Sequence, residues 1–122
     1  MSNKLGKVLV VEDDEDVLEM IKHILEECNF RVLTATNGRD ALESFKEFGA
    51  DAVLTDIRMP LMGGYRLIYE INKLNATIPT FTFSGYLNEF DQNDEKAKEP
   101  KSSFEKPLDM EKVIEAISSE FI

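Results

Sequence analysis

The chain is poor in cysteine and in long apolar runs. Cys28 is the one cysteine among 122 residues, so no internal disulfide is possible and a reducing compartment is expected. No apolar run approaches the roughly 20 residues that a membrane-spanning helix needs. Near the N-terminus the apolar run Val8–Val11 meets acidic residues at once, which is too short for the core of a signal peptide. We therefore expect a soluble, cytoplasmic protein.

Basic residues are also few. The 14 Lys and Arg residues face 24 Asp and Glu residues, giving a formal net charge of −10. This balance argues against a nucleic-acid-binding surface and against an anionic membrane as partner. It suits the binding of cations or of basic partners. The length allows one domain with a real core and is too short for two ordinary ones, so we expect a single domain over residues 1–122.

Two periodicities alternate along the sequence. Continuous apolar or β-branched runs predict strands, and apolar residues at helical spacing predict helices. The strands are expected at 7–11, 31–36, 52–54, 78–84 and 102–105, and the helices at 17–28, 41–48, 67–74 and 109–121. The second helix is expected to turn Leu42, Phe45 and Phe48 inward. Strands that alternate with helices predict an α/β fold, with a parallel sheet covered on both faces.

The pattern is lost between Asn88 and Lys101. Phe90 is the only large apolar residue of this stretch, so no buried helix face can be drawn. The stretch is either a weak, solvated helix that ends before Pro100 or a mobile loop.

Polar side chains follow four of the predicted strands at their carboxyl ends. Glu12 and Asp13 follow the first strand, and Asp56 follows the third. Ser84 ends the fourth strand, and Lys106 follows the fifth. Because the carboxyl ends of parallel strands open on one side of the sheet, where such folds bind ligands, we expect these side chains to meet there.

This set of side chains indicates phosphoryl chemistry. Three carboxylates close together repel one another and take up protons unless a cation joins them. Oxygen ligands without histidine or cysteine favour Mg²⁺ or Mn²⁺ over zinc. A lysine and a hydroxyl opposite them suit the oxygens of a phosphoryl group, and a carboxylate can serve as its covalent acceptor.

The motifs at the strand ends carry a family resemblance. They are Val10-Val11-Glu12-Asp13-Asp14, then Asp56-x-x-Met59-Pro60 with Gly64, then Ser84-Gly85, then Lys106-Pro107. In this order they make the chain resemble a response-regulator receiver domain of two-component signalling, from Val8 to about Phe121. The resemblance implies a doubly wound (βα)5 domain with five parallel strands in the order 2-1-3-4-5. The fourth helix of that fold would be weak or disordered here.

The resemblance also implies roles for the acidic residues. Asp56 would be the phosphoacceptor and form an acyl phosphate. Mg²⁺ (or Mn²⁺) would be bound by Asp13, by Asp56 and by the backbone carbonyl of Arg58, with help from Glu12.

The remaining roles concern the phosphoryl group and its source. Ser84 and Lys106 would contact the phosphoryl oxygens, and the bond from Lys106 to Pro107 would be cis. The donor would be a phosphohistidine on a sensor histidine kinase or a histidine phosphotransfer protein, and a downstream protein would be the target. The domain would catalyse only its own phosphorylation and dephosphorylation.

The sequence departs from the family at the fifth strand and in the loop after Asp56. Receivers usually carry Tyr or Phe three residues before the lysine, where this chain has Ser103. Phe104 comes one residue later and is expected to point to the opposite face, unless a bulge restores its direction. Gly63 replaces the acid that usually precedes Gly64.

Two alternative functions are compatible with this pattern. The first is a pseudo-receiver, a binding module whose switching is altered or absent, which the substitution at Ser103 favours. The second is a Mg²⁺-dependent hydrolase with an aspartyl nucleophile. Such phosphatases usually need a second acid two residues after the nucleophile, and this chain has Arg58 there.

Overall fold

The computed structural model describes residues 4–85 and 94–121. Its elements are β1 (Lys7–Val11), α1 (Glu15–Glu27), β2 (Arg31–Ala35), α2 (Gly38–Phe48), β3 (Ala52–Asp56), α3 (Gly64–Leu74), β4 (Thr80–Ser84), β5 (Ser102–Glu105), α4 (Met110–Ser118) and a short 3₁₀ helix, η1 (Ser119–Phe121). The strands form one sheet in the order β2-β1-β3-β4-β5, and every neighbouring pair is parallel. The predicted fold and strand order are confirmed.

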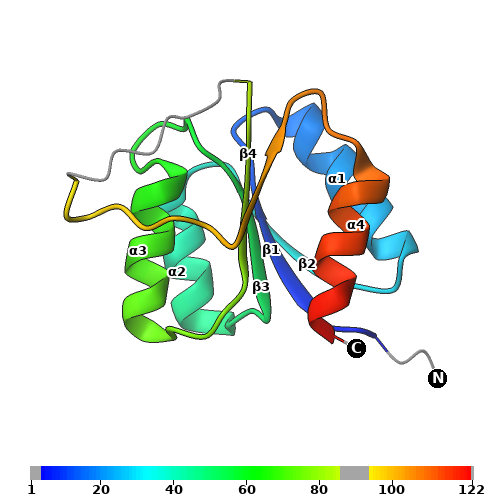
Figure 1. Cartoon of the computed structure of the whole chain (residues 1–122), viewed down its shortest axis with the longest axis horizontal. Helices are drawn as coiled ribbons and strands as arrows, with labels where there is room; N and C mark the ends of the chain where they lie inside the picture. Colours follow the sequence, from blue (N-terminus) through cyan, green and yellow to red (C-terminus); the bar gives the residue numbers. More distant parts are fainter. Residues whose placement is uncertain (1–3, 86–93, 122) are drawn as a thin grey trace.

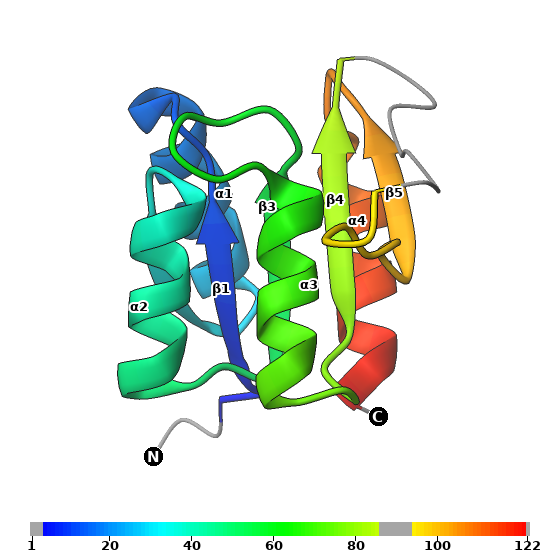
Figure 2. The same ribbon diagram turned by 90° about the vertical axis from the view of Figure 1, so that its left-hand side faces the viewer.

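The sheet is covered on both faces. Figure 1 shows it between a layer of α2 and α3 and a layer of α1 and α4. In Figure 2 the parallel strands run toward one edge, where the loops before α1 and α3 also lie. Each layer has its own apolar core, with Val10, Phe81 and Phe83 on the α1 and α4 side. Among the described residues no helix has the length and apolar content to cross a bilayer.

Three helices begin at the polar residues that the sequence places before them. Asp14 accepts hydrogen bonds from two backbone N–H groups in the first turn of α1. Asn37 caps α2 and Asp109 caps α4 in the same way. Side-chain oxygens at these positions satisfy N–H groups that have no partner within the helix. The first two caps hold the loops that follow β1 and β2 at the carboxyl edge of the sheet.

One core assignment was wrong. Phe48 is 54% exposed, although its helical spacing from Phe45 places it on the inner face of α2. Its carbonyl accepts a hydrogen bond from the Lys7 side chain, N to O 2.9 Å. Since Lys7 is the first residue of β1, the last turn of α2 lies level with the end of the sheet. Phe48 therefore has no sheet surface to pack on.

The fourth strand and the stretch after it also differ from the prediction. Strand β4 begins at Thr80 rather than at residue 78, because Pro79 has no N–H to donate. Of the weak stretch 88–101, residues 88–93 lie outside the described residues. Residues 94–101 contain a turn and irregular backbone, with no helix. The Lys98 amide donates to the carbonyl of Tyr65, so the described part of this stretch lies against the start of α3.

Candidate functional site

Three acidic residues converge at the carboxyl edge of the sheet. Glu12 follows β1 directly, and Asp56 is the last residue of the adjacent strand β3. One carboxylate oxygen from each of Glu12, Asp13 and Asp56 lies within 4.8 Å of the others. Glu12 and Asp56 are buried, whereas Asp13 is exposed. The structure therefore brings together the three acids that the sequence singled out.

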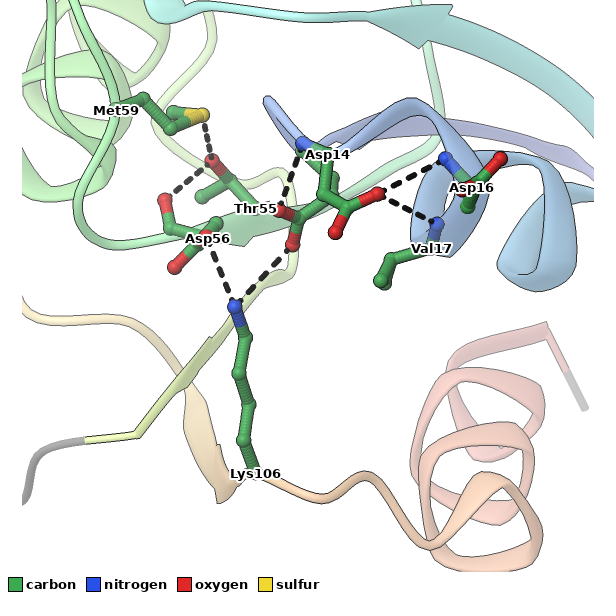
Figure 3. Close-up of polar contacts among 8 residues, drawn as sticks. Asp14, Asp16, Val17, Thr55, Asp56, Met59 and Lys106 are labelled. Carbon is green, nitrogen blue, oxygen red and sulfur yellow. Dashed lines mark hydrogen bonds and ion pairs between the residues drawn. The ribbon is translucent and has the colours of Figure 1, made fainter.

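Lys106, the residue after β5, extends its side chain into the same cluster (Figure 3). Its Nζ lies 3.1 Å from Asp56 Oδ2 and 3.4 Å from Glu12 Oε2. The side chain reaches over the end of β4, with Nζ 5.4 Å from the centroid of the Phe83 ring. Its backbone amide donates to the Ser84 carbonyl, N to O 2.8 Å. The bond from Lys106 to Pro107 is cis, as expected.

Burial and charge shift the protonation of two of these groups. The pKa of Glu12 is raised from 4.5 to about 7, first by burial and then by the nearby charge of Asp56, against the hydrogen bond from the Asp14 amide. Burial alone would lower the pKa of Lys106, but the hydrogen bond and charge of Asp56 raise it above its ordinary value. Glu12 therefore carries a proton for part of the time near neutral pH, while Lys106 stays charged.

The residues fit a divalent cation. If all of them are ionised, three carboxylates and the Lys106 ammonium carry three negative charges and one positive charge, a net −2. Within the described part of the chain, Glu12 Oε2 is a buried oxygen that accepts no hydrogen bond, and the Lys106 ammonium lies 3.4 Å from it as an ion pair. A hard cation that prefers carboxylate oxygens matches both this charge and this oxygen. Arg58, two residues after Asp56, has an exposed side chain.

Ser84 lies at the same edge of the sheet, beside a hollow. It is the last residue of β4 and is buried, one residue beyond Phe83, which pairs with Asp56. The hollow has a volume of about 770 Å³ and is also lined by Ile57, Tyr65 and Ser103. Ser84 thus lines a space that Ile57, the residue after Asp56, also lines.

Close packing holds the loop between β3 and α3 against the acceptor candidate. The Gly64 amide donates to the Ile57 carbonyl, N to O 2.8 Å. A Cβ at position 64 would overlap the carbonyl oxygen of Asp56, and one at position 38 would overlap that of Met62. Glycine at these two positions lets the loop fold back over the end of β3.

The fifth strand follows the simpler of the two expectations. Its pairing with β4 runs without interruption from Ser102 to Glu105, so no bulge turns Phe104. The Phe104 ring stacks on Phe81, with centroids 6.4 Å apart and an interplanar angle of 25°, and is partly buried against the core under α1 and α4. On the other face, the Ser103 hydroxyl lies 2.9 Å from that of Thr82.

Two contributors were missed at the sequence level. Thr55 Oγ1 donates to the backbone carbonyl of Asp56, O to O 2.9 Å (Figure 3). Thr82 is fully buried and bonded to Ser103. The signal was present, because alternation along β3 and β4 places these threonines on one face beside the site residues.

Comparison with known proteins gives one consistent result. A family profile described as "Response regulator receiver domain" matches residues 8–118. A response regulator receiver protein of Anaeromyxobacter sp. (strain Fw109-5) is 32% identical over 83 residues, which is 68% of this chain and 35% of that protein. The transcriptional regulatory protein ZraR of Klebsiella oxytoca is 37% identical over 86 residues, 70% of this chain and 19% of that protein. The chain thus spans about a third or less of the length of these relatives.

Solved structures agree with the fold. The chemotaxis response regulator CheY4 of Vibrio cholerae superposes with a TM-score of 0.82 at 23% identity, covering 94% of this chain and 98% of that one. The response regulator TrrA of Thermotoga maritima, solved in complex with Mg²⁺-BeF, gives a TM-score of 0.82 at 25% identity, covering 93% and 97%. Both likenesses extend over nearly the whole of each chain.

Proposed function

The chain belongs to the response regulator receiver domain family, and on that premise we propose that it is a phosphoacceptor of a two-component phosphorelay. A phosphoryl group is transferred from a phosphohistidine to Asp56 in the presence of Mg²⁺. The observation that carries this proposal is the convergence of Glu12, Asp13 and Asp56 with Lys106 Nζ 3.1 Å from Asp56 Oδ2. Residues 1–122 act as one receiver domain in the cytoplasm.

The acids hold the cation that the reaction needs. Asp13, Asp56 and the backbone carbonyl of Arg58 are the ligands, and Glu12 supports the site from its buried position. When bound, Mg²⁺ (or Mn²⁺) offsets the charge of the carboxylates and of the phosphoryl oxygens. Near neutral pH its binding requires Glu12 to give up the proton that burial otherwise retains.

Asp56 is the nucleophile. One of its carboxylate oxygens forms a bond to phosphorus as the bond from phosphorus to the donor imidazole nitrogen breaks, and the electron pair stays on that nitrogen. Lys106, already beside Asp56, moves its ammonium to a phosphoryl oxygen. The Ser84 hydroxyl donates to another. Hydrolysis of the acyl phosphate reverses the state, and the chain catalyses no other reaction.

The partners follow from this chemistry. The donor is a sensor histidine kinase or a histidine phosphotransfer protein, and the phosphorylated domain changes its contacts with a downstream protein. The net charge of −10 makes direct binding of nucleic acid by this domain unfavourable.

The test is covalent labelling by a small acyl phosphate. The folded chain is incubated with acetyl phosphate and MgCl₂, and its intact mass is measured. The wild-type chain should gain the mass of one phosphoryl group, and EDTA should abolish the gain. Asp56→Asn should remain unlabelled, whereas Asp51→Asn, which changes an exposed acid before the same strand, should be labelled normally. Absence of labelling in the folded wild-type chain would refute the proposal.

One observation favours a second candidate, a binding module whose switching is altered or absent. The aromatic ring of β5, Phe104, packs against the core on Phe81 and is not beside Ser84. If the wild-type chain is labelled but its binding to partners is the same in both states, this second function is the correct one.

A further inference from the structure

A hydroxyl pair joins the last two strands of the sheet on the face turned toward α2 and α3. Thr82 in β4 pairs with Ser103 in β5, and their hydroxyl oxygens lie 2.9 Å apart. Thr82 is fully buried, whereas Ser103 is exposed on the edge strand. The pair therefore links the interior of the sheet to its outer edge.

The same row of residues extends to the acceptor site. Thr55 in β3 pairs with Thr82, and its hydroxyl donates to the carbonyl of Asp56. Since paired residues of neighbouring strands share a face, Thr55, Thr82 and Ser103 form one row of hydroxyls across three strands. The row lies one residue before Asp56 on β3 and two residues before Ser84 on β4.

The aromatic ring of β5 cannot serve this connection. Phe104 lies on the opposite face, stacked on Phe81. On the Ser84 face, the hydroxyl pair is a side-chain link between β4 and β5, and the Lys106 amide adds a backbone link to the Ser84 carbonyl. A displacement of the end of β4 therefore reaches β5 through polar contacts.

We infer that the Thr82–Ser103 hydroxyl pair transmits the state of the acceptor site from β4 to the exposed edge strand β5. The inference rests on the proposed phosphorylation of Asp56. When the Ser84 hydroxyl turns to a phosphoryl group, the carboxyl end of β4 moves with it, and the hydrogen bond two residues earlier carries the shift to Ser103. Each hydroxyl can both donate and accept, so the bond survives a small change in geometry.

A binding partner could contact Ser103 directly, because this residue is exposed. Ser103 lines the hollow of about 770 Å³ that Ser84 and Tyr65 also line. The same surface therefore contains one residue from the site and one from the edge strand, which allows a partner to distinguish the two states there.

The experiment uses the whole chain with MgCl₂ and beryllium fluoride, a mimic of the phosphoryl group. Amide NMR shifts are compared with and without the mimic in each variant. In the wild-type chain the mimic should shift Ile57 and Gly85 near the site and also Phe104 and Glu105 in β5. In Ser103→Ala the β5 shifts should fall at least threefold, while those near the site and the affinity for the mimic stay within twofold.

Three further variants separate transmission from simple loss of structure. Thr82→Val removes the other hydroxyl at nearly constant shape and should give the same loss. Ser103→Thr keeps a hydroxyl and should restore the β5 response. Ser102→Ala changes the adjacent serine, which points to the other face, and should leave the response intact.

The possible failures are distinguishable. Undiminished β5 shifts in Ser103→Ala, or a wild-type β5 that does not respond while Ile57 and Gly85 do, would overturn the inference and leave the proposed function standing. Absence of any response at Ile57 and Gly85 in the wild-type chain would overturn both.

Discussion

Replacing Glu12 by glutamine should remove a large part of the pH dependence of stability in the metal-free chain. The pKa of Glu12 is raised from 4.5 to about 7 in the folded state, chiefly by burial. Between these values the folded chain holds a proton that the unfolded chain has lost, so stability falls as the pH rises through this window. Each pKa unit corresponds to about 1.4 kcal/mol, and linkage over this shift gives a loss of about 2–3 kcal/mol between pH 5 and pH 8.

The assay is urea unfolding followed by far-UV circular dichroism, in EDTA, at several pH values from 5 to 8. Groups outside the acid cluster titrate alike in the wild-type chain and the variant, so the difference between the two profiles reports on Glu12 and the groups coupled to it. The glutamine variant should lack this fall of about 2–3 kcal/mol and should be the more stable of the two at pH 8. MgCl₂ at pH 8 should stabilise the wild-type chain more than the variant. Parallel profiles in EDTA would show that Glu12 titrates normally and would refute the reasoning from burial.

Three other substitutions, one of them with a matched control, have expected outcomes. Lys106→Gln should slow Mg²⁺-dependent labelling of Asp56 by acetyl phosphate about 100-fold without abolishing Mg²⁺ binding, and an unchanged labelling rate would show that the ammonium does not contact the phosphoryl group. Gly64→Ala should destabilise the chain in urea by about 1–3 kcal/mol, because its Cβ would overlap the Asp56 carbonyl, whereas Gly85→Ala has open space around its Cβ and should be neutral. Phe104→Ala should cost roughly 2–3 kcal/mol in the same assay, since the ring is packed on Phe81, and a neutral result would place the ring outside the core.

Periodicity predicted most of the fold because the helices have apolar residues at helical spacing and most strands are continuous apolar or β-branched runs. Strand β1 runs from Lys7 to Val11, as expected, and ends where the acidic residues begin. The caps at Asp14, Asn37 and Asp109 mark the starts of three helices. Helical spacing failed at Phe48, because it gives the direction of a side chain and not the extent of the sheet beneath it. That extent depends on where β1 begins relative to the end of α2, which is set by tertiary packing and not by local spacing.

The site could be predicted because parallel strands place their carboxyl ends together. That rule brings the three acids and Lys106 together from the sequence alone. The rule gives no distances, so it could not show that Glu12 Oε2 is buried without a hydrogen bond among the described residues. Alternation along β5 gave the direction of Phe104. It did not give the Thr82 contact of Ser103, because that contact depends on the register of two strands far apart in sequence.

The most direct measurement of the central claim is the position of the acyl phosphate in the labelled chain. After treatment with acetyl phosphate and MgCl₂, reduction with borohydride converts a phosphorylated aspartate to homoserine, and peptide mass spectrometry locates it. We predict homoserine at position 56 and at no other aspartate, because Asp56 is a buried aspartate whose carboxylate contacts Lys106. Homoserine at Asp13 with Asp56 unmodified, or label on His23 in place of any aspartate, would contradict the assignment of Asp56 as the phosphoacceptor.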